Sequence, residues 1–576
     1  MTEILNLRHE RIDDVPLLLG VGQQLGLADI LNRHLGTHGL QQGLHNGQLA
    51  VGWLTFILSQ ADHRKSAVRD WANGLSQTLS QAFGRPLREV DFSDDRLGNV
   101  AQRLSDEAAW DAIEQELWAA TMNVYELSLS GVRLDSTTSY GFHQPDENGV
   151  MQRGHSKDHR PDLAQLKLMA AVAEPTGQLM CSAVHNGSAA DDPLYMPLIH
   201  RVRRMVNRTG LLYSGDCKMA ALNTRAELVA GHDYYLMPLP LTGENQTLFT
   251  RAVEAIVAGE QAATLLWNEQ TLLGAGYELV REQSAIQDGQ PLTWSERVLI
   301  VRSNTLAQKQ RAHLEQRLTK ATAALLALTP AVARGKRQIR EEAALTEAIN
   351  TVLERHEVKE LLAVKWERQE HTRTHHVGRG RPAQAGQRTQ RTHTEVRYVI
   401  TAVERIEAAI TARQHRLGWR MQATNASVER LNLTQAVLHY RGGWTIERDF
   451  HLLKAQPLGF SPLFVWKDEQ IIGVTHLLTL ALRLLTLIES QVRHGQKQNA
   501  EEMRGLYEGQ PNRTTTRPTS TRLLKAFVRA PITLTCIETS AGVKRHVTPL
   551  SELQLQILRL LRLPSSLYAA ISVNSE

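Results

Sequence analysis

The sequence predicts an α/β or α+β core that follows a helical segment and is interrupted by a long insertion. Residues 1–127 place apolar side chains at helical spacing. Residues 128–240 contain strand patterns first and then alternate between helix and strand patterns. Residues 241–425 include a long polar helix and a basic stretch, and separate this first part of the core from helical residues 426–495. A chain of 576 residues is long enough for three or four domains.

The composition is that of a globular protein of the reducing cytosol. The formal net charge of +5 permits a polyanionic partner without requiring one. Three cysteines lie far apart without a CxxC pair, which argues against a disulfide framework and a cysteine zinc site. The charged N-terminus is no signal peptide. The apolar run 471–489 contains His476 and Arg483, so we expect a buried helix and no membrane span.

The helical start of the chain is open to two interpretations. Asp94 could cap the helix that follows it. Arg64, Lys65 and Arg69 could belong to short helices that read DNA, or the segment could be a purely structural bundle.

Strand and helix signals then follow one another through the core and the insertion. The pattern predicts core strands that include GVRLD, ending at Asp135, and LLYSGD, ending at Asp216. Residues 166–187 read as two strands joined by a Pro-Thr-Gly turn. Further elements are helices at 193–207 and 223–230, strands at 233–240, 277–282, 297–303 and 395–403, a long helix at 305–329, a mobile basic loop at 371–393, a linker at 509–521 and a helix at 551–567.

The stretch YRGGWTIERDFHLLK, residues 440–454, holds one carboxylate among basic groups. Read as one helix, Tyr440, Trp444, Glu447 and Lys454 lie roughly on one face. The stretch fits a metal-binding carboxylate beside a phosphate backbone, and it also fits a surface helix with salt bridges.

Two further acids give this carboxylate a chemical context. Phosphoryl transfer on nucleic acid uses two divalent ions about 3.5–4 Å apart, and Mg²⁺ prefers carboxylate oxygen and water. Asp135 and Asp216 at strand ends, with Glu447 on a helix, would supply such ligands. Each acid alone is more typical of a turn or a helix cap, whereas the three together favour a metal site.

Four segments together resemble the DDE-type transposases of bacterial insertion sequences. More narrowly, they resemble the branch with a large β-rich insertion before the glutamate and a Tyr-Arg-Glu-Lys signature around it. The resemblance covers nearly the whole chain. The segments are VRLDSTTSYGFH (132–143), GHSKDHRPDLAQLKL (154–168), LLYSGDCKMA (211–220) and YRGGWTIERDFHLLK (440–454).

The resemblance implies a ribonuclease H-like catalytic core, in which Asp135, Asp216 and Glu447 bind two Mg²⁺ (or Mn²⁺) ions per active site. It implies metal-dependent cleavage at transposon ends and strand transfer into target DNA. The implied partners are double-stranded DNA, as terminal inverted repeats and as target, and a second copy in a homodimer, because two ends must be paired. The implied location is the bacterial cytoplasm, in association with the nucleoid.

The patterns along the chain, with the roles that the resemblance implies, give the domain boundaries that we expect. These are a helical DNA-binding domain at 1–127, the first part of the core at 128–240, the insertion with strands, long helix and basic loop at 241–425, the second part of the core with the catalytic glutamate at 426–495, and an extension with a linker and a helix at 496–576.

The signature carries over with one departure. Tyr440 and Lys454 match its tyrosine and lysine and would contact DNA phosphate, which positions the duplex without reading its sequence. The usual arginine, three residues after the tyrosine, is Gly443 here. Arg441 or Arg448 could supply that charge.

Several other residues have a functional and a structural interpretation. Lys157 and Arg160 could lie near DNA or the active site, or in a salt-bridged turn. Arg379 and Arg381 match a short minor-groove hook, or a solvated loop. An insertion tryptophan could stack on a flipped base, although most tryptophans are core residues; the three in question are Trp267, Trp294 and Trp366. Cys217 reads as a small packing residue.

Two rival functions remain open from the sequence. One is a two-metal DNA nuclease with the same core and no strand transfer. The other is a non-catalytic DNA-binding protein derived from a transposase, against which the intact acids argue.

Overall fold

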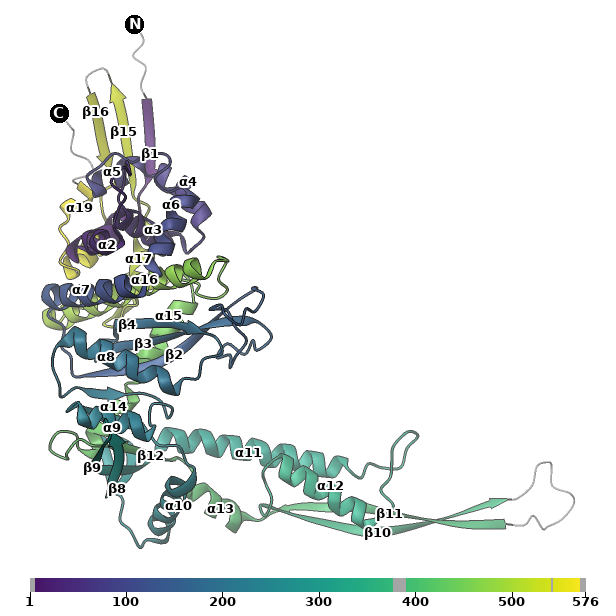
Figure 1. Ribbon diagram of the computed structural model, residues 1–576. Coiled ribbons are helices and arrows are strands. Elements are labelled where there is room, and N and C mark those ends of the chain that lie inside the picture. Colours follow the sequence, from purple (N-terminus) through teal and green to yellow (C-terminus); the bar gives the residue numbers. More distant parts are fainter. Residues whose placement is uncertain (1–5, 377–389, 540–541, 570–576) are drawn as a thin grey trace, which may run out of the picture.

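The computed structural model describes residues 6–376, 390–539 and 542–569. It consists of a body and a long arm that projects sideways from one end of the body (Figure 1). The arm belongs to the predicted insertion, and the sheet that contains Asp135 runs through the body.

A nine-stranded mixed sheet forms the centre of the body. Its strand order is β4-β3-β2-β5-β6-β12-β9-β8-β7. β2 runs antiparallel to β3 and parallel to β5, and β5 runs parallel to β6. The strands are β2 (Gly131–Gly141), β3 (Ala164–Glu174), β4 (Gln178–Asn186), β5 (Leu212–Ser214), β6 (Tyr234–Pro238), β7 (Thr264–Asn268), β8 (Thr271–Gln287), β9 (Gln290–Ser303) and β12 (Trp419–Thr424). The fold is therefore mixed α/β, as the sequence predicts.

Helices cover both faces of strands β2–β4, which is why β3 is buried along its whole length. Side chains alternate between the faces: Leu134 and Met169 pack on the α8 side, whereas Leu168 and Ala170 pack with α15 and α16. Figure 1 shows α8 and α16 on opposite sides of these strands. The helices are α8 (Tyr195–Val206), α9 (Leu222–Ala230), α10 (Gly243–Ala258), α14 (Leu433–Arg441), α15 (Trp444–Lys454) and α16 (Asp468–Asn499).

The two ends of the chain share one hydrophobic core. The N-terminal helices pack with α16 and the C-terminal helices in a single buried cluster. The first described segment is a strand, β1 (Asn6–Arg11), which pairs antiparallel with β15. The prediction that residues 1–127 are entirely helical is therefore wrong for these residues. The helices are α1 (Val15–Gln24), α2 (Leu27–Leu35), α3 (Asn46–Gln60), α4 (Val68–Asn73), α5 (Ser76–Phe83), α6 (Asp94–Leu104), α7 (Glu107–Tyr125), α17 (Ser520–Arg529), α18 (Glu552–Leu560) and α19 (Ser566–Ala569).

Small strands and single-turn helices complete the body. Asp94 is the first residue of α6 and Ser93 is its N-cap, one residue earlier than predicted. The predicted linker 509–521 contains a short strand and the start of α17. The short elements are η1 (Lys65–Ala67), η2 (Asp192–Leu194), β13 (Met503–Arg504), β14 (Thr514–Thr515), β15 (Thr533–Thr539) and β16 (Gly542–Val547).

The long apolar helix α16 is a core helix. It is long and apolar enough to cross a membrane, but 94% of its most apolar window is buried inside the protein. Arg483, within this helix, pairs with the buried Glu114 of α7, and Nδ1 of His476 donates a hydrogen bond to the carbonyl of Leu104. The expectation of a buried helix is confirmed.

The arm has a hydrophobic core of its own. α11 (Asn304–Ala327) and α12 (Glu342–Arg355) pack on the base of a two-stranded ribbon of β10 (Leu362–His376) and β11 (Gln390–Arg405), and α13 (Glu407–His415) leads back to the body. The prediction of a mobile loop over 371–393 is wrong at both ends. Residues 371–376 and 390–393 continue the two strands, because each strand satisfies the backbone hydrogen bonds of the other.

Candidate active site

Asp135 projects from the middle of β2 toward α15. The strand runs on to Gly141, so the prediction that it ends at Asp135 is wrong. Alternation puts Asp135 on the same face as Arg133 and opposite to Leu134, which packs on the α8 side. Its Oδ1 accepts hydrogen bonds from the backbone N–H of Ser136 at 2.7 Å and from Nζ of Lys157 at 3.3 Å.

Asp216 lies two residues past the end of β5. Because β5 runs parallel to β2 beside it, the turn after β5 comes close to Asp135. Oδ1 of Asp216 accepts hydrogen bonds from the hydroxyl of Tyr195 at 2.7 Å and from the backbone N–H of Lys218 at 2.9 Å. Both aspartates are therefore held by partners at Oδ1.

Glu447 lies in the first turn of α15. Asn432 caps α14 by accepting from the N–H of Gln435, and the helix ends at Arg441. Gly442 and Gly443 then separate α14 from α15, so the reading of Tyr440 to Lys454 as one continuous helix is wrong. Glycine has a low helix propensity, which accounts for a break at this place.

The three acids line one cavity of about 320 Å³. It is bounded by β2, the turn after β5, and the junction between α14 and α15. Three arginines and two aromatic residues line the same cavity: Arg133, Arg420, Arg441, Tyr440 and Trp444. Trp444 is 54% exposed. The cavity thus joins carboxylates to cationic side chains, a combination that suits a metal ion next to a phosphate group.

The donor chemistry of the cavity fits a hard divalent cation. Carboxylate oxygens are the ligands that Mg²⁺ and Mn²⁺ prefer. Among the described residues, Oδ2 of Asp135 and Oδ2 of Asp216 have no recorded hydrogen-bond partner. The acids share a cavity without forming a cluster: no group of three His, Cys, Asp or Glu that could hold a metal occurs in the described part of the chain.

Burial and neighbouring charges act in opposite directions on Asp135. Desolvation raises its pKa above the ordinary value, and the negative charge of Asp216 adds to this effect. The ammonium of Lys157 lowers the pKa and so favours the ionised carboxylate. The mutual effect of the two aspartates means that a cation between or beside them would relieve their repulsion.

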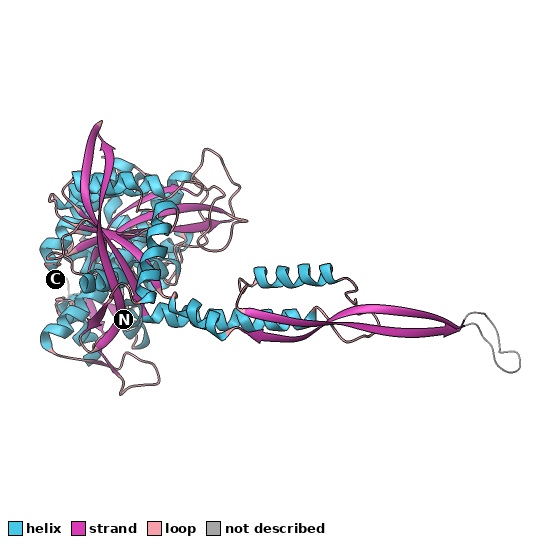
Figure 2. Cartoon of the chain, turned by 90° about the horizontal axis from the view of Figure 1, so that it is seen from below, coloured by secondary structure: helices cyan, strands magenta, loops and turns pink. Residues whose placement is uncertain are grey.

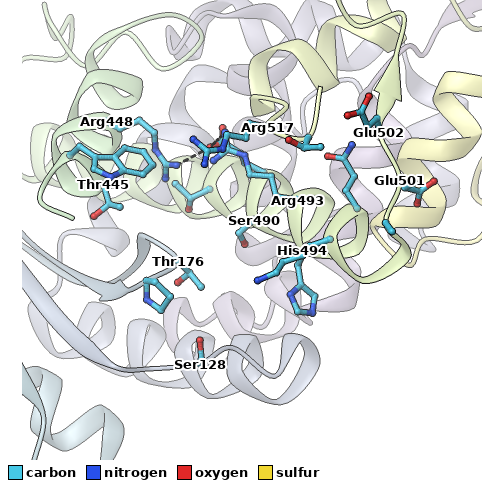
Figure 3. A pocket seen from close by; sticks show the side chains of 18 residues that line it. Ser128, Thr176, Thr445, Arg448, Ser490, Arg493, His494, Glu501, Glu502 and Arg517 are labelled. Carbon is cyan, nitrogen blue, oxygen red and sulfur yellow. Dashed lines mark hydrogen bonds and ion pairs between the residues drawn. The ribbon is translucent and has the colours of Figure 1, made fainter. Parts of the chain in front are cut away.

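Arg441 and Arg448 have different surroundings. The guanidinium of Arg441 lines the acid cavity and donates to the carbonyl of Leu273 at 3.0 Å. Arg448 instead donates to Asp449 and, at 2.8 Å, to Glu489 on α16, and both acids are buried. Figure 3 shows Arg448 beside Thr445 in a second cavity of about 960 Å³, with Ser490, Arg493 and His494. Of the two candidates, only Arg441 faces the acids.

The loop before β3 is tied to the acid cavity at two points. Lys157 contacts Asp135 and donates to the carbonyl of Ser136 at 2.6 Å. Lys454, at the end of α15, forms an ion pair with Asp158. Arg160 forms a bidentate pair with Asp162 and lies over the ring of Tyr140, as in the salt-bridged turn of the structural interpretation.

Arg133 is a cavity residue that the sequence reasoning missed. It is buried in β2, and its Nε donates to Glu174 at 2.7 Å. Its second nitrogen donates to the carbonyl of His439 in α14 at 2.7 Å. A Cβ at Gly443 would lie 3.4 Å from its third nitrogen. A guanidinium therefore lies beside the position where the signature arginine is missing.

The remaining predicted residues lie apart from this cavity. Arg379 and Arg381 fall outside the described residues. Trp294 is buried, Trp267 is 48% exposed on β7, and Trp366 packs edge-to-face against Tyr398 in the arm. Cys217 is exposed, so its interpretation as a packing residue is wrong; it follows Asp216 in an open turn and not in a strand.

Comparison with known proteins matches the chain to a family and to solved structures. The profile of the family described as the transposase DDE domain matches residues 127–482, more than half of the chain. A cryo-EM structure of the piggyBac transposase synaptic complex with hairpin DNA is similar at 10% identity and a TM-score of 0.23, over 52% of this chain and 61% of that one. The chain thus spans less than two thirds of that relative, and no curated protein matches it. From the family match, this chain belongs to the transposase DDE domain family, whose members carry out phosphoryl transfer on DNA.

Proposed function

We propose that the chain is a DNA transposase that cleaves transposon ends and transfers the freed strand into target DNA. The observation that carries this proposal is the shared cavity of Asp135, Asp216 and Glu447. The three acids come from β2, the turn after β5, and α15, which are far apart in sequence. Roles in turns or helix caps would not bring the three acids into one cavity. In-line phosphoryl transfer with two divalent ions would require this arrangement.

Asp135, Asp216 and Glu447 would hold two Mg²⁺ (or Mn²⁺) ions. When bound, such ions activate the attacking water or 3′-hydroxyl and stabilise the leaving oxygen. Lys157 lowers the pKa of Asp135 and so favours its ionised form, and Tyr195 fixes the orientation of Asp216 by its hydrogen bond. Outer partners of this kind orient ligands and raise metal affinity.

The arginines of the cavity would bind the scissile strand. Arg441 and Tyr440 line the cavity next to Glu447, which supports contact with phosphate. Arg133 provides a third nitrogen at the Gly443 position. Lys157 belongs to the loop before β3 and Lys454 pairs with Asp158 of the same loop, so DNA would compete with Asp158 for Lys454. We assign Arg448 a different role, in joining α15 to α16.

The domain roles follow the same proposal. Residues 128–240 and 426–495 would form a ribonuclease H-like core, which the antiparallel β2-β3-β4 set, the parallel β5 and β6, and the helices on both faces support. Residues 1–127 would bind the terminal inverted repeats, and a homodimer would pair two ends. Residues 241–425 would contact DNA from the arm.

One experiment separates this function from its rivals. Labelled duplexes made from the DNA that flanks the gene, with a free 3′-hydroxyl, are incubated with plasmid and Mg²⁺. A transposase joins the label to the plasmid, and the Glu447→Gln variant does not. Cleavage without joining indicates a nuclease, and binding without cleavage indicates a non-catalytic protein. The Glu469→Gln variant, which changes an exposed glutamate at the start of α16, serves as the control.

A further inference from the structure

The far end of the arm is a two-stranded ribbon whose two faces differ chemically. β10 and β11 pair from Leu362 with Arg405 to His376 with Gln390. Side chains alternate between the faces of such a ribbon, and directly opposite residues share a face. One face, here called the basic face, presents Arg373, His375, Arg391 and His393; the other presents Thr372, Thr374, Thr392 and Thr394. All eight residues are exposed.

The positive side chains at the base of the arm form ion pairs, whereas those at its far end do not within the described residues. Near the body, Lys365 pairs with Glu404, and Arg405 pairs with Glu315 at 2.8 Å. Residues 371–376 and 390–394 contain no Asp or Glu. In the part of the chain that the structure describes, neither Arg373 nor Arg391 forms an ion pair, and the acids next to this segment, Glu370 and Glu395, pair with Arg368 and Arg340. The far end of the ribbon therefore carries uncompensated positive charge.

None of the described residues 371–376 and 390–394 belongs to the hydrophobic core of the arm. The hydrophobic core of the arm ends with Trp366, Tyr398 and their neighbours at the base of the ribbon. Figures 1 and 2 show the far end of the ribbon extending beyond α11 and α12, clear of the body. β10 alone, with 15 residues, spans ~50 Å at ~3.4 Å per residue. A long ribbon held away from the core is suited to reach a partner at a distance from the acids.

The chemistry of the ribbon selects the kind of partner. Protein–protein interfaces have cores that are apolar and poor in charge. The exposed residues 371–375 and 391–394 are only Thr, His and Arg, which offer hydrogen bonds and positive charge. Duplex DNA presents a regular array of phosphates, and its major groove, about 12 Å wide, admits a two-stranded ribbon.

We propose that the basic face of the ribbon binds the phosphate backbone of duplex DNA at a second site, remote from the acid cavity. This inference rests on the proposed function, in that it takes the substrate to be DNA. The second site would hold the duplex that leaves the cavity, and because it contacts phosphate it would do so for any sequence.

The test compares the salt dependence of DNA binding between matched variants of the full-length chain. The probe is a labelled duplex of about 40 base pairs, ~135 Å long at ~3.4 Å per step. The test variant is Arg373→Gln with Arg391→Gln. The control is Thr374→Gln with Thr392→Gln, which puts the same side chain on the opposite face of the same ribbon.

We expect the slope of log affinity against log salt concentration to be smaller by about 1.8 in the test variant, because each phosphate contact contributes about 0.9 to the slope. The ratio of the DNA affinity of the wild type to that of the test variant would then fall about 12-fold between 50 and 200 mM salt. The control should keep the wild-type slope. An unchanged slope in the test variant, or equal losses in both variants, overturns the inference.

Two outcomes distinguish a failure of this inference from a failure of the proposed transposase function. If the wild type fails to bind the duplex at any salt concentration, both proposals fail. If the wild type binds and the test variant changes only the dimer fraction in sedimentation, the ribbon contacts a second copy of the chain, and the inference alone is overturned.

Discussion

The hydroxyl of Tyr195, on α8, donates a 2.7 Å hydrogen bond to Oδ1 of Asp216. Tyr195 is fully buried, and burial beside Asp216 raises the pKa of its phenol, so the hydroxyl keeps its proton. The bond fixes one carboxylate oxygen and leaves Oδ2 for the cavity. Helix α8 thereby takes part in the acid site from the opposite side of the sheet.

The Tyr195→Phe variant should lose metal affinity by ~10–100-fold, the usual cost of removing an outer partner of a ligand. Cleavage should recover at high Mg²⁺ concentration, because Asp216 itself remains. The measurement is the Mg²⁺ dependence of the cleavage rate.

Tyr235→Phe provides the matched control for this prediction. Tyr235 is also buried and donates to Glu296 at 2.6 Å, away from the acid cavity. Both variants should lose about 1 kcal/mol of stability. Equal Mg²⁺ dependence in the two variants would show that the Tyr195 bond only supports folding.

Each of Asp135→Asn, Asp216→Asn and Glu447→Gln should lower the cleavage rate by more than ~100-fold, because each removes a direct ligand of the ions. Melting temperatures should stay within a few degrees of wild type, since all three side chains reach the cavity and none supports the core. Retained cleavage in any one variant would remove that residue from the site.

Arg441→Gln and Arg448→Gln should have opposite profiles. Arg441 faces the cavity, so its loss should reduce cleavage and DNA affinity with little change in stability. Loss of Arg448 leaves Asp449 and Glu489 buried without their partner, which should cost roughly 3 kcal/mol of stability. Thermal melting and cleavage assays of both variants distinguish the two roles. A reversed pattern would give the phosphate contact to Arg448.

Asp14 should make stability depend on pH. Its pKa is raised from 3.8 to about 6, mainly by burial, against the hydrogen bond from Ser59. Because the folded pKa is the higher one, the stabilisation is fully present below about 4 and is lost as pH rises through about 6. The difference corresponds to about 3 kcal/mol.

The Asp14→Asn variant should abolish this dependence, since it cannot ionise. Denaturant unfolding at pH 4.5 and 7.5, buffered and at constant salt, measures the effect. If the free energy of unfolding changes by the same amount between the two pH values in the wild type and in the variant, the assignment of Asp14 is wrong.

Local patterns in the sequence predict most elements of the core. The turn between β3 and β4 is an example, because Gly177 has a φ of +72° that glycine adopts without strain. The long helix α11 begins one residue before its prediction and ends two residues early. At Gly442 and Gly443, the helical spacing of the sequence runs through a pair of weak helix formers, and the helix breaks there.

Contacts between distant segments are what the sequence does not reveal. Arg133 looks like an ordinary strand residue, and its role depends on Glu174 and on the carbonyl of His439, more than 300 residues away. In the arm, the basic composition of residues 371–393 favours a loop, whereas the structure pairs residues 371–376 with 390–395 as strands. Only the pairing of the two strands decides between them.

The pairing of β1 with β15 has a consequence for how the protein is made. Arg11 lies opposite Thr533, so β1 pairs with a strand that is synthesised 522 residues later. At ~5–20 residues per second, β1 waits on the order of a minute for its partner strand. The N-terminal helices share their core with α16–α18, so they too must wait before their apolar faces are covered. The body therefore closes only after β15 has been synthesised, and a chain that stalls before that point keeps these apolar faces uncovered.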